Sequence, residues 1–336
     1  MQVGVKRTAA RGPVVTEASR GAREFDLISR IRQRAGERDD VVLGIGDDAA
    51  LLRVPPGELL VVAMDTLNRG VHFPDDTVPA DIGWKVLAVN LSDLAAMGAR
   101  PAWCTLSLSL PEADLAWIDA FLDGFLALSA RHDVVLVGGD TTRGPLSACV
   151  TVHGFVAPDA VMRRDAARPG DDVWISGHLG DASAALVQWR AGATIDPALR
   201  ARLDRPEPRV TLGQALRGLV HACIDVSDGL LADLGHVCAA SAVGAEIDID
   251  ALPASAALQD SFAGDARRHA QAIGGDDYEL CFTAPQAARG EVIARASSIG
   301  VPVTRIGRIV FASGVRALLD DGAVWAPATT GYVHFA

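Results

Sequence analysis

Cysteine is scarce in this chain, and no two cysteines form a paired motif. The five cysteines are scattered, odd in number and make no Cys-x-x-Cys. This excludes the common zinc and dithiol spacings, and it is typical of reduced thiols in the cytoplasm, where we expect the protein. Apolar runs are short as well, since none approaches the roughly 18 residues of a membrane helix. We therefore expect no membrane partner.

Positive charge is also limited. The chain carries 31 Lys and Arg residues against 42 Asp and Glu residues, a formal net charge of −11. An acidic surface argues against nucleic acid as a partner. It does not argue against a nucleotide, because metal ions can offset the carboxylates. Residues 1–23 are basic and rich in Ala and Gly but lack the apolar core of a signal peptide, so we expect a disordered extension there.

The common catalytic signatures are missing too. The sequence contains no GxxxxGK[ST], no HExxH and no GxSxG. A P-loop, a zincin-type metal site and the usual nucleophile elbow are therefore excluded. Any phosphate or metal chemistry must rest on another arrangement of residues.

Helix and strand patterns are present throughout, without the strict alternation of a doubly wound sheet. Apolar spacing predicts helices over residues 25–34, 79–97, 112–130 and 229–241, and strands over 102–110, 134–137, 146–156, 172–176, 222–226, 245–249, 279–283 and 303–309. Several strands would form antiparallel hairpins, so the pattern predicts an α+β fold with mixed sheets. With 49% hydrophobic residues, the chain can build a sizeable core.

Proline and glycine mark one boundary in the chain. Pro158, Pro169 and Gly170 interrupt the pattern after the strand that ends near residue 156. Because 336 residues are enough for two domains, we expect an N-terminal domain over residues 24–157 and a C-terminal domain over 158–336. The Pro- and Arg-rich stretch 193–209 is expected to be a surface segment with solvated arginines.

The stretch LGIGDDAALLRVPPGELLVVAMDTLNRGVHF, residues 43–73, is the most informative. Two apolar runs flank a Pro-Pro-Gly turn, which predicts a hairpin that would bring Asp48 and Asp65 together. Close carboxylates repel unless a proton or cation lies between them. Mg²⁺ prefers carboxylate oxygens and usually shares its shell with substrate phosphates. The alternative is that the Gly-Asp-Asp sequence is simply a polar turn.

Carboxylates recur where a strand or helix meets a loop. The six loci are Asp47-Asp48, Asp65, Asp93, Asp140, Asp225 with Asp228, and Asp276-Asp277 with Glu279. Each alone could be a turn or N-cap aspartate. Several adjoin glycines, as in Gly138-Gly139, and glycine lets the backbone approach a phosphate closely. Together they predict a phosphate site that binds several metal ions.

These motifs resemble those of the thiamine-monophosphate kinase family. The resemblance covers residues 24–335 and rests on GIGDDAALL, MDTLNRGVHF, AVNLSDLAAMGARP, GGDTTRGPLS, SGHLGDASAAL, CIDVSDGLLADLGH, GGDDYELCF and GYVHF. It implies a two-domain fold like that of aminoimidazole ribonucleotide synthetase, with a homodimer formed through the N-terminal sheet. It also implies transfer of the γ-phosphoryl group of ATP to thiamine monophosphate, which gives thiamine diphosphate.

The resemblance further implies roles for individual residues. Several Mg²⁺ ions would be held by Asp48, Asp65, Asp93, Asp140, Asp225 and Asp228. ATP would contact Gly139, Asp140, Arg164 and Ser227, and the thiamine phosphate would contact His72, Glu279 and Tyr332. No general base is required, because a phosphate nucleophile is already largely ionised at neutral pH. One departure stands out: family members often have Ser or Thr before the Asp of MDTL, where this chain has Ala63 and Met64.

Each of these residues also has a structural alternative. His72 could be a surface histidine, Ser227 a helix cap and Tyr332 a core residue. Arg164 follows Arg163, so either arginine could face the phosphates. Two other functions stay open: a related ATP-using synthetase with a different acceptor, and a nucleotide-binding protein without catalysis.

Overall fold

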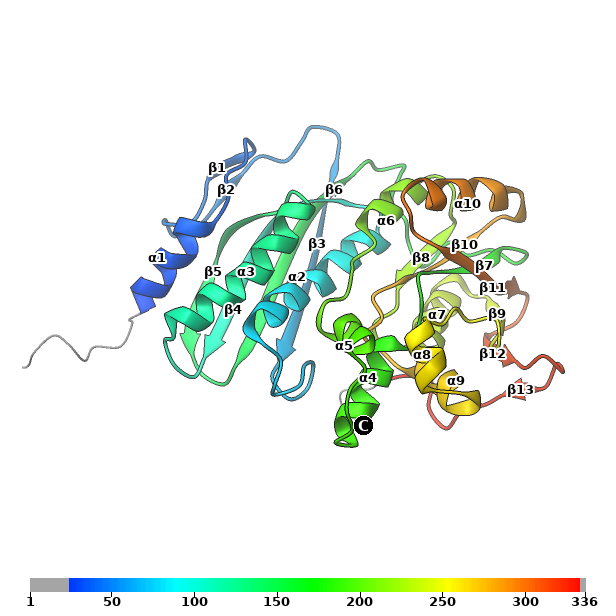
Figure 1. The fold of residues 1–336 in the computed structure, drawn as a ribbon. Coiled ribbons are helices and arrows are strands. Elements are labelled where there is room, and N and C mark those ends of the chain that lie inside the picture. The colour runs from blue at the N-terminus through cyan, green and yellow to red at the C-terminus, as the bar shows by residue number, and fades with distance from the viewer. Residues whose placement is uncertain (1–23, 333–336) are drawn as a thin grey trace, which may run out of the picture.

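Two sheets, each covered by helices, make up the protein. The computed structural model describes residues 24–332 (Figure 1). The first sheet has the order β3–β6–β4–β5 and is built from β3 (Leu59–Asn68), β4 (Arg100–Leu110), β5 (Val135–Arg143) and β6 (Ser147–Val156). The expected disordered extension, residues 1–23, and the end of the GYVHF motif, residues 333–335, lie outside the described residues. The mixed sheets and their helices confirm the predicted α+β class.

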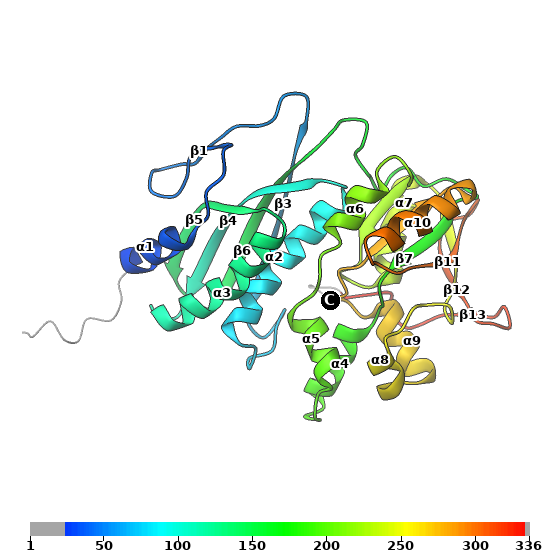
Figure 2. The ribbon, with the colours of Figure 1, turned by 45° about the horizontal axis from the view of Figure 1, so that its top comes forward.

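Two long helices cover one face of the first sheet (Figures 1 and 2). They are α2 (Pro79–Ala96) and α3 (Leu115–Arg131). Pro79 suits the first turn of α2, because its missing N–H has no partner there in any helix. The backbones approach closely where glycines face the other helix: a Cβ on Gly124 would lie 1.7 Å from the Ala80 carbonyl oxygen. Most of α2 is therefore buried between α3 and the sheet.

The predicted hairpin, in which residues 49–52 pair with residues 59–64, is wrong. β2 (Leu51–Leu52) pairs with β1 (Val41–Leu43), whereas β3 pairs along its whole length with β6. The ten-residue ladder of β3 and β6 offers more hydrogen bonds and more apolar contact than a short local hairpin would. The argument that a hairpin places Asp48 beside Asp65 therefore fails.

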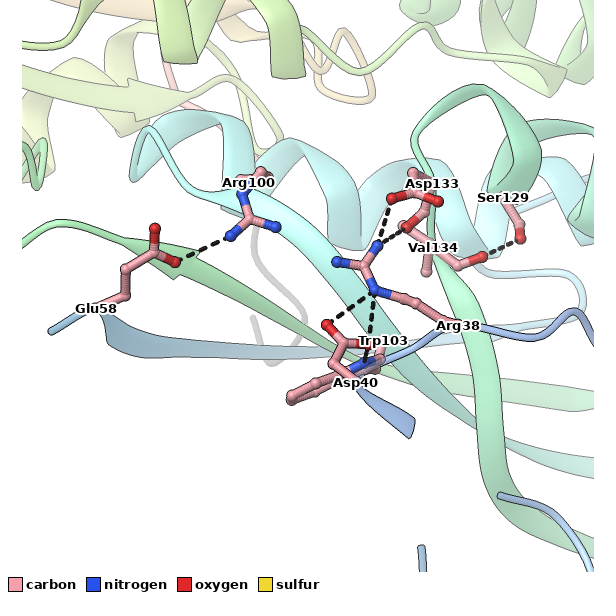
Figure 3. A network of polar contacts seen from close by, with 8 residues as sticks. All are labelled: Arg38, Asp40, Glu58, Arg100, Trp103, Ser129, Asp133 and Val134. Atoms are coloured by element: carbon pink, nitrogen blue, oxygen red, sulfur yellow. Dashed lines mark hydrogen bonds and ion pairs between the residues drawn. The ribbon is translucent and has the colours of Figure 1, made fainter. Parts of the chain in front are cut away.

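A polar network fixes the chain that leads into β1 (Figure 3). Arg38 bonds the Asp40 carboxylate at 2.8 Å and also reaches the carbonyl and carboxylate of Asp133. The indole N–H of Trp103, on β4, donates to the same Asp40 at 2.9 Å. Val41 and Leu52 then pack against Trp103 and its neighbours. The β1–β2 pair is thereby attached to the sheet face that α2 and α3 leave open.

The second sheet is larger and has the order β13–β12–β9–β11–β7–β10–β8. Its strands are β7 (Asp172–Ser176), β8 (Ala222–Asp225), β9 (Gly244–Asp248), β10 (Leu280–Ala284), β11 (Val303–Val310), β12 (Gly314–Leu318) and β13 (Val324–Trp325). The flanking helices are α4 (Asp181–Arg190), α5 (Pro197–Asp204), α6 (Val210–Leu216), α7 (Leu230–Ser241), α8 (Ala256–Ser261), α9 (Gly264–Ile273) and α10 (Arg289–Ser298), with α1 (Glu24–Arg34) on the first sheet's side. Within residues 24–332 no helix is long and apolar enough to cross a membrane.

The arginines of residues 193–209 are not solvated charges, contrary to the expectation. Arg200, Arg202, Arg205 and Arg209 each pair with a carboxylate. Arg205 bonds Asp81 on α2 and lies 5.4 Å from the ring of Trp84, whose indole N–H donates to the Pro206 carbonyl. The segment joins the two halves of the chain, and that tertiary role could not be inferred from its composition.

Candidate active site

Three carboxylates lie within electrostatic range of one another where the two sheets meet. Asp65 lies on β3, Asp93 on α2 and Asp225 at the end of β8. The Asp65 backbone N–H donates to Asn90 Oδ1 at 2.9 Å, and Asn90 is fully buried on α2. This bond fixes β3 against the helix one turn before Asp93. The edge strand of the first sheet and the last strand of the second therefore share one acidic centre.

Burial and mutual repulsion raise the pKa values of these carboxyls. Burial, followed by the charges of Asp225 and Asp65, raises the pKa of Asp93 to about 8. Burial is also the main cause that raises the pKa of Asp225 to about 6. The pKa of Asp65 is raised by burial and then by the charge of Asp228. Carboxylates that repel in this way favour a cation between them.

The turn before α7 places Ser227 and Asp228 beside this centre. Asp233 Oδ2 accepts the backbone N–H groups of Ser227, Asp228 and Gly229 at 3.1 to 3.2 Å. Burial, then the neighbouring carboxylates, raises the pKa of Asp233 to about 7. Our sequence reasoning missed this residue, although an acidic side chain in the first turn of a helix is a recognisable signal.

A pocket of about 910 Å³ opens beside Asp65. His72, Ser227, Asp228 and Tyr332 line it, as do parts of the Gly274–Tyr278 loop. His72 Nδ1 accepts the Asn68 N–H at 3.0 Å, so the neutral imidazole carries its proton on Nε2. Tyr332 is half exposed, and its backbone N–H donates to the Asp228 carbonyl at 2.9 Å. Tyr332 is therefore a pocket residue and not a core residue.

A second pocket, of about 420 Å³, lies on the other side of the carboxylates. It is lined by Asp93, Asp225 and Arg164, with β3 residues as its floor. Arg163 and Arg164 are both exposed and both line this pocket, and Arg163 bonds Asp165 at 2.5 Å. Arg164 instead acts electrostatically on both Asp93 and Asp225. Arg163 is therefore already paired with a carboxylate, whereas the charge of Arg164 acts on the acidic centre.

Three residues that were predicted to bind metal or ATP lie away from the acidic centre in this structure. Asp48 is exposed in the loop between β1 and β2. Gly139 and Asp140 do not form a loop, because β5 continues through them in parallel pairing with β4. Asp140 pairs with Ser107, and through it aligns with Cys149 on β6 and Thr66 on β3. These residues face the open side of the sheet, whereas Asp65 faces α2.

Glu279 is enclosed and does not face either pocket. It is fully buried at the start of β10 and accepts the Ser176 hydroxyl at 2.6 Å. Arg202 bonds it at 2.8 Å, and Arg209 bonds both of its oxygens, one of them at 2.6 Å. A Cβ on Gly177 would lie 2.1 Å from the same carboxylate, so only glycine fits there. In this structure Glu279 connects β10 with β7 and with the segment around α5.

The acidic centre has the oxygen-donor chemistry that divalent cations prefer. Within residues 24–332, no three His, Cys, Asp or Glu side chains converge closely enough to hold one ion among them. The charges of Asp65, Asp225 and Asp228 nevertheless repel carboxylates of this centre, and Arg164 offsets part of that repulsion at Asp93 and Asp225. Mg²⁺ commonly takes one or two carboxylates and completes its shell with water and phosphate. The donor set therefore suits an ion that arrives with a phosphorylated ligand.

Family models match both halves of the chain. Residues 46–156 match the N-terminal domain, and residues 168–320 the C-terminal domain, of the AIR synthase related proteins. A curated thiamine-monophosphate kinase of Salmonella typhimurium is 45% identical over 320 residues, which cover 93% of this chain and 98% of that protein.

Solved structures give the same result. Thiamine-monophosphate kinase from Stenotrophomonas maltophilia is 58% identical with a TM-score of 0.83, over 89% of this chain and 98% of that one. A second, AaThiL complexed with AMPPCP and TMP, is 31% identical with a TM-score of 0.73, over 96% and 99% of the two chains. The chain belongs to the thiamine-monophosphate kinase family of the AIR synthase related proteins.

Proposed function

We propose that the protein transfers the γ-phosphoryl group of ATP to thiamine monophosphate, giving thiamine diphosphate and ADP. One observation carries the proposal: an acidic centre of Asp65, Asp93 and Asp225 lies between a pocket with Arg164 and a larger pocket with His72 and Tyr332. Two phosphorylated ligands could meet at such a centre. The likeness to a relative complexed with AMPPCP and TMP supports this arrangement.

The chemistry requires charge neutralisation more than a base. The attacking group is a phosphate oxygen that is largely ionised at neutral pH. The obstacle is the repulsion between two polyanions and the developing charge on the transferred group. Mg²⁺, when bound, supplies that neutralisation and orients the phosphates. Asp65, Asp93, Asp225 and Asp228 would hold the ions, and Arg164 adds a fixed planar donor for the phosphates of ATP.

The larger pocket is the proposed acceptor site. His72 presents Nε2–H as a donor to the phosphate of the acceptor, because Nδ1 is already occupied. Tyr332 offers an aromatic face to the cationic thiazolium ring. Ser227, on the turn that Asp233 holds, lies between this pocket and the carboxylates. A substrate contact by Glu279 stays a prediction that would require its ion pairs to rearrange.

We also propose a homodimer formed through the open face of the first sheet. Large apolar side chains of β3 are exposed there: Leu60, Val62 and Met64 are 44 to 63% accessible. Monomeric proteins rarely expose a continuous apolar patch of this kind. Asp140 lies on the same face, so a second copy would bring its Gly139, Asp140 and Asp48 toward the interface. In this proposal the ATP site takes residues from both chains.

A product assay tests the activity. Purified protein would be incubated with ATP, Mg²⁺ and thiamine monophosphate, and thiamine diphosphate and ADP would be quantified together. Equal yields are expected. ADP without thiamine diphosphate would contradict the proposal and favour a related synthetase with another acceptor. Unphosphorylated thiamine in place of the monophosphate is the control, and it should give neither product. A cytoplasmic location stays a prediction.

A further inference from the structure

Lys85 is a buried cation with a defined set of partners. Its side chain is 1% exposed on α2, near the larger pocket. Nζ donates to the His72 carbonyl at 3.0 Å and to Asp276 Oδ2 at 3.1 Å. A buried ammonium is costly unless it is paired and hydrogen-bonded, and here both conditions are met. One atom of the N-terminal half thus bonds two loops that line the pocket.

Lysine is unusual in this chain, which makes the position informative. Of the 31 Lys and Arg residues only Lys6 and Lys85 are lysines, and Lys6 lies outside the described residues. The others of these 31 residues are arginines. A guanidinium is planar and spreads its charge over a rigid fork, whereas the lysine ammonium is a compact point charge. Lys85 places this compact charge between the His72 carbonyl and Asp276.

The loop opposite Lys85 is held in a strained conformation. Asp276 and Tyr278 both have positive φ, +68° and +50°, although neither is glycine. Such residues persist only where the surroundings determine them, and they cluster at binding sites. The Tyr278 hydroxyl donates to Asp276 Oδ1 at 3.0 Å, and the backbone N–H groups of both residues bond the segment 226–227. Asp276 therefore receives Lys85 on one oxygen and Tyr278 on the other.

We propose that Lys85 is a positioning residue that sets the width of the acceptor pocket. The chain of contacts runs from the His72 carbonyl through Lys85 and Asp276 to Tyr278, and its members other than Lys85 line the pocket. It joins the His72 wall, from the first half, to the Gly274–Tyr278 wall, from the second half. The inference rests on the proposed function, because it takes the acceptor to be thiamine monophosphate in this pocket.

The test compares variants by their KM values for the two substrates and by calorimetric binding of thiamine monophosphate. Lys85→Met should raise the KM and Kd for thiamine monophosphate by about tenfold or more, while the KM for ATP stays within about twofold. Lys85→Arg should not restore the affinity. Tyr278→Phe should produce a smaller change in the same direction, and it carries the test if Lys85 variants fail to fold.

A double variant distinguishes the positioning of the pocket walls by Lys85 from simple neutralisation of the Asp276 charge. Lys85→Met leaves the Asp276 carboxylate without its cation, so part of any loss is instability. Lys85→Met with Asp276→Asn removes both charges and should recover the melting temperature without recovering acceptor affinity. Recovery of both would overturn the inference, as would an unchanged acceptor KM in folded Lys85→Met.

Arg205→Gln is the matched control. It breaks another ion pair between α2 and the second half of the chain, the one to Asp81, away from the pocket. We expect a lower melting temperature and an unchanged KM for thiamine monophosphate. A rise in that KM equal to the rise in Lys85→Met would overturn a specific role for Lys85. A parent protein that binds thiamine monophosphate but makes no diphosphate would count against the proposed function and leave the binding test intact.

Discussion

Asp65 and Asp140 belong to one sheet and face opposite sides of it. Asp65 aligns with Val150 and Leu106, which α2 and α3 cover, whereas Asp140 aligns with Ser107 and Cys149 on the open side. Side chains of a strand alternate between faces, so the two carboxylates of one chain do not share an ion across the sheet. If both serve one site, they must either meet around an edge of the sheet or come from different chains.

Mixing inactive chains tests this relationship. In a dimer whose sites combine Asp65 of one chain with Asp140 of the other, an Asp65→Asn chain and an Asp140→Asn chain together contain one intact site. After unfolding and refolding as an equal mixture, about a quarter of parent activity should return. Each variant refolded alone is the control. If mixed dimers form but no activity returns, both residues belong to the site of the same chain.

Replacement of Asp65 tests the metal assignment. Asp65→Asn keeps the backbone bond to Asn90 but removes a charged oxygen ligand, so kcat should fall by about a hundredfold or more. Asp123→Asn is the control, since Asp123 pairs with Arg34 at the surface of α3. Thermal melting of both variants should match the parent. Activity of Asp65→Asn within a few-fold of the parent would refute the role.

The acidic centre predicts a pH dependence of the metal-free protein. The folded pKa of Asp93 is raised to about 8 from an ordinary value of 3.8. A raised carboxyl pKa stabilises the fold below the ordinary value, and the contribution is lost as pH rises through the folded pKa. In a chelator, the melting temperature should therefore fall from about pH 5 to about pH 8. Asp93→Asn should flatten this dependence of the melting temperature on pH. Mg²⁺ with ATP should reduce the fall in the parent protein. An unchanged slope in Asp93→Asn would exclude Asp93 as its cause.

Because Glu279 is buried in ion pairs, we expect its replacement to lower the stability of the fold. Glu279→Gln removes the charge that Arg202 and Arg209 share, and breaking a buried ion pair should lower the free energy of unfolding by about 3 kcal/mol. Glu246→Gln is the matched control, because Glu246 pairs with Arg308 and Arg316 near the surface and should lose under about 1 kcal/mol. Urea unfolding measures both. Unchanged stability with a raised KM for thiamine monophosphate would instead support a direct substrate contact.

The exposed ring of Tyr332 predicts an effect on one substrate. Tyr332→Ala should raise the KM for thiamine monophosphate by about fivefold and leave the KM for ATP unchanged, because only the acceptor has a cationic ring. Tyr332→Phe keeps the aromatic face and should stay close to the parent. A selective rise in the KM for ATP would place the acceptor elsewhere.

The sequence by itself determined the local elements and the chemical types of the site residues. Helical spacing predicted α2 and α3 to within a few residues, because both bury regular apolar faces. Clustered aspartates beside glycines indicated phosphate and metal chemistry, since no other common residue pattern supplies such oxygen ligands. The family resemblance rested on the same motifs.

Only the tertiary structure decided which of these residues meet. Pairing of β3 with β6, not with β2, separated Asp48 from Asp65, because a long ladder outweighs a nearby turn. Alternation along β5 and β3 placed Asp140 and Asp65 on opposite faces. Packing of α5 and α6 between the halves gave buried partners to arginines that looked solvated, and it enclosed Glu279. Lys85 had no sequence signal at all, since its role depends on Asp276, which lies 191 residues further along the chain.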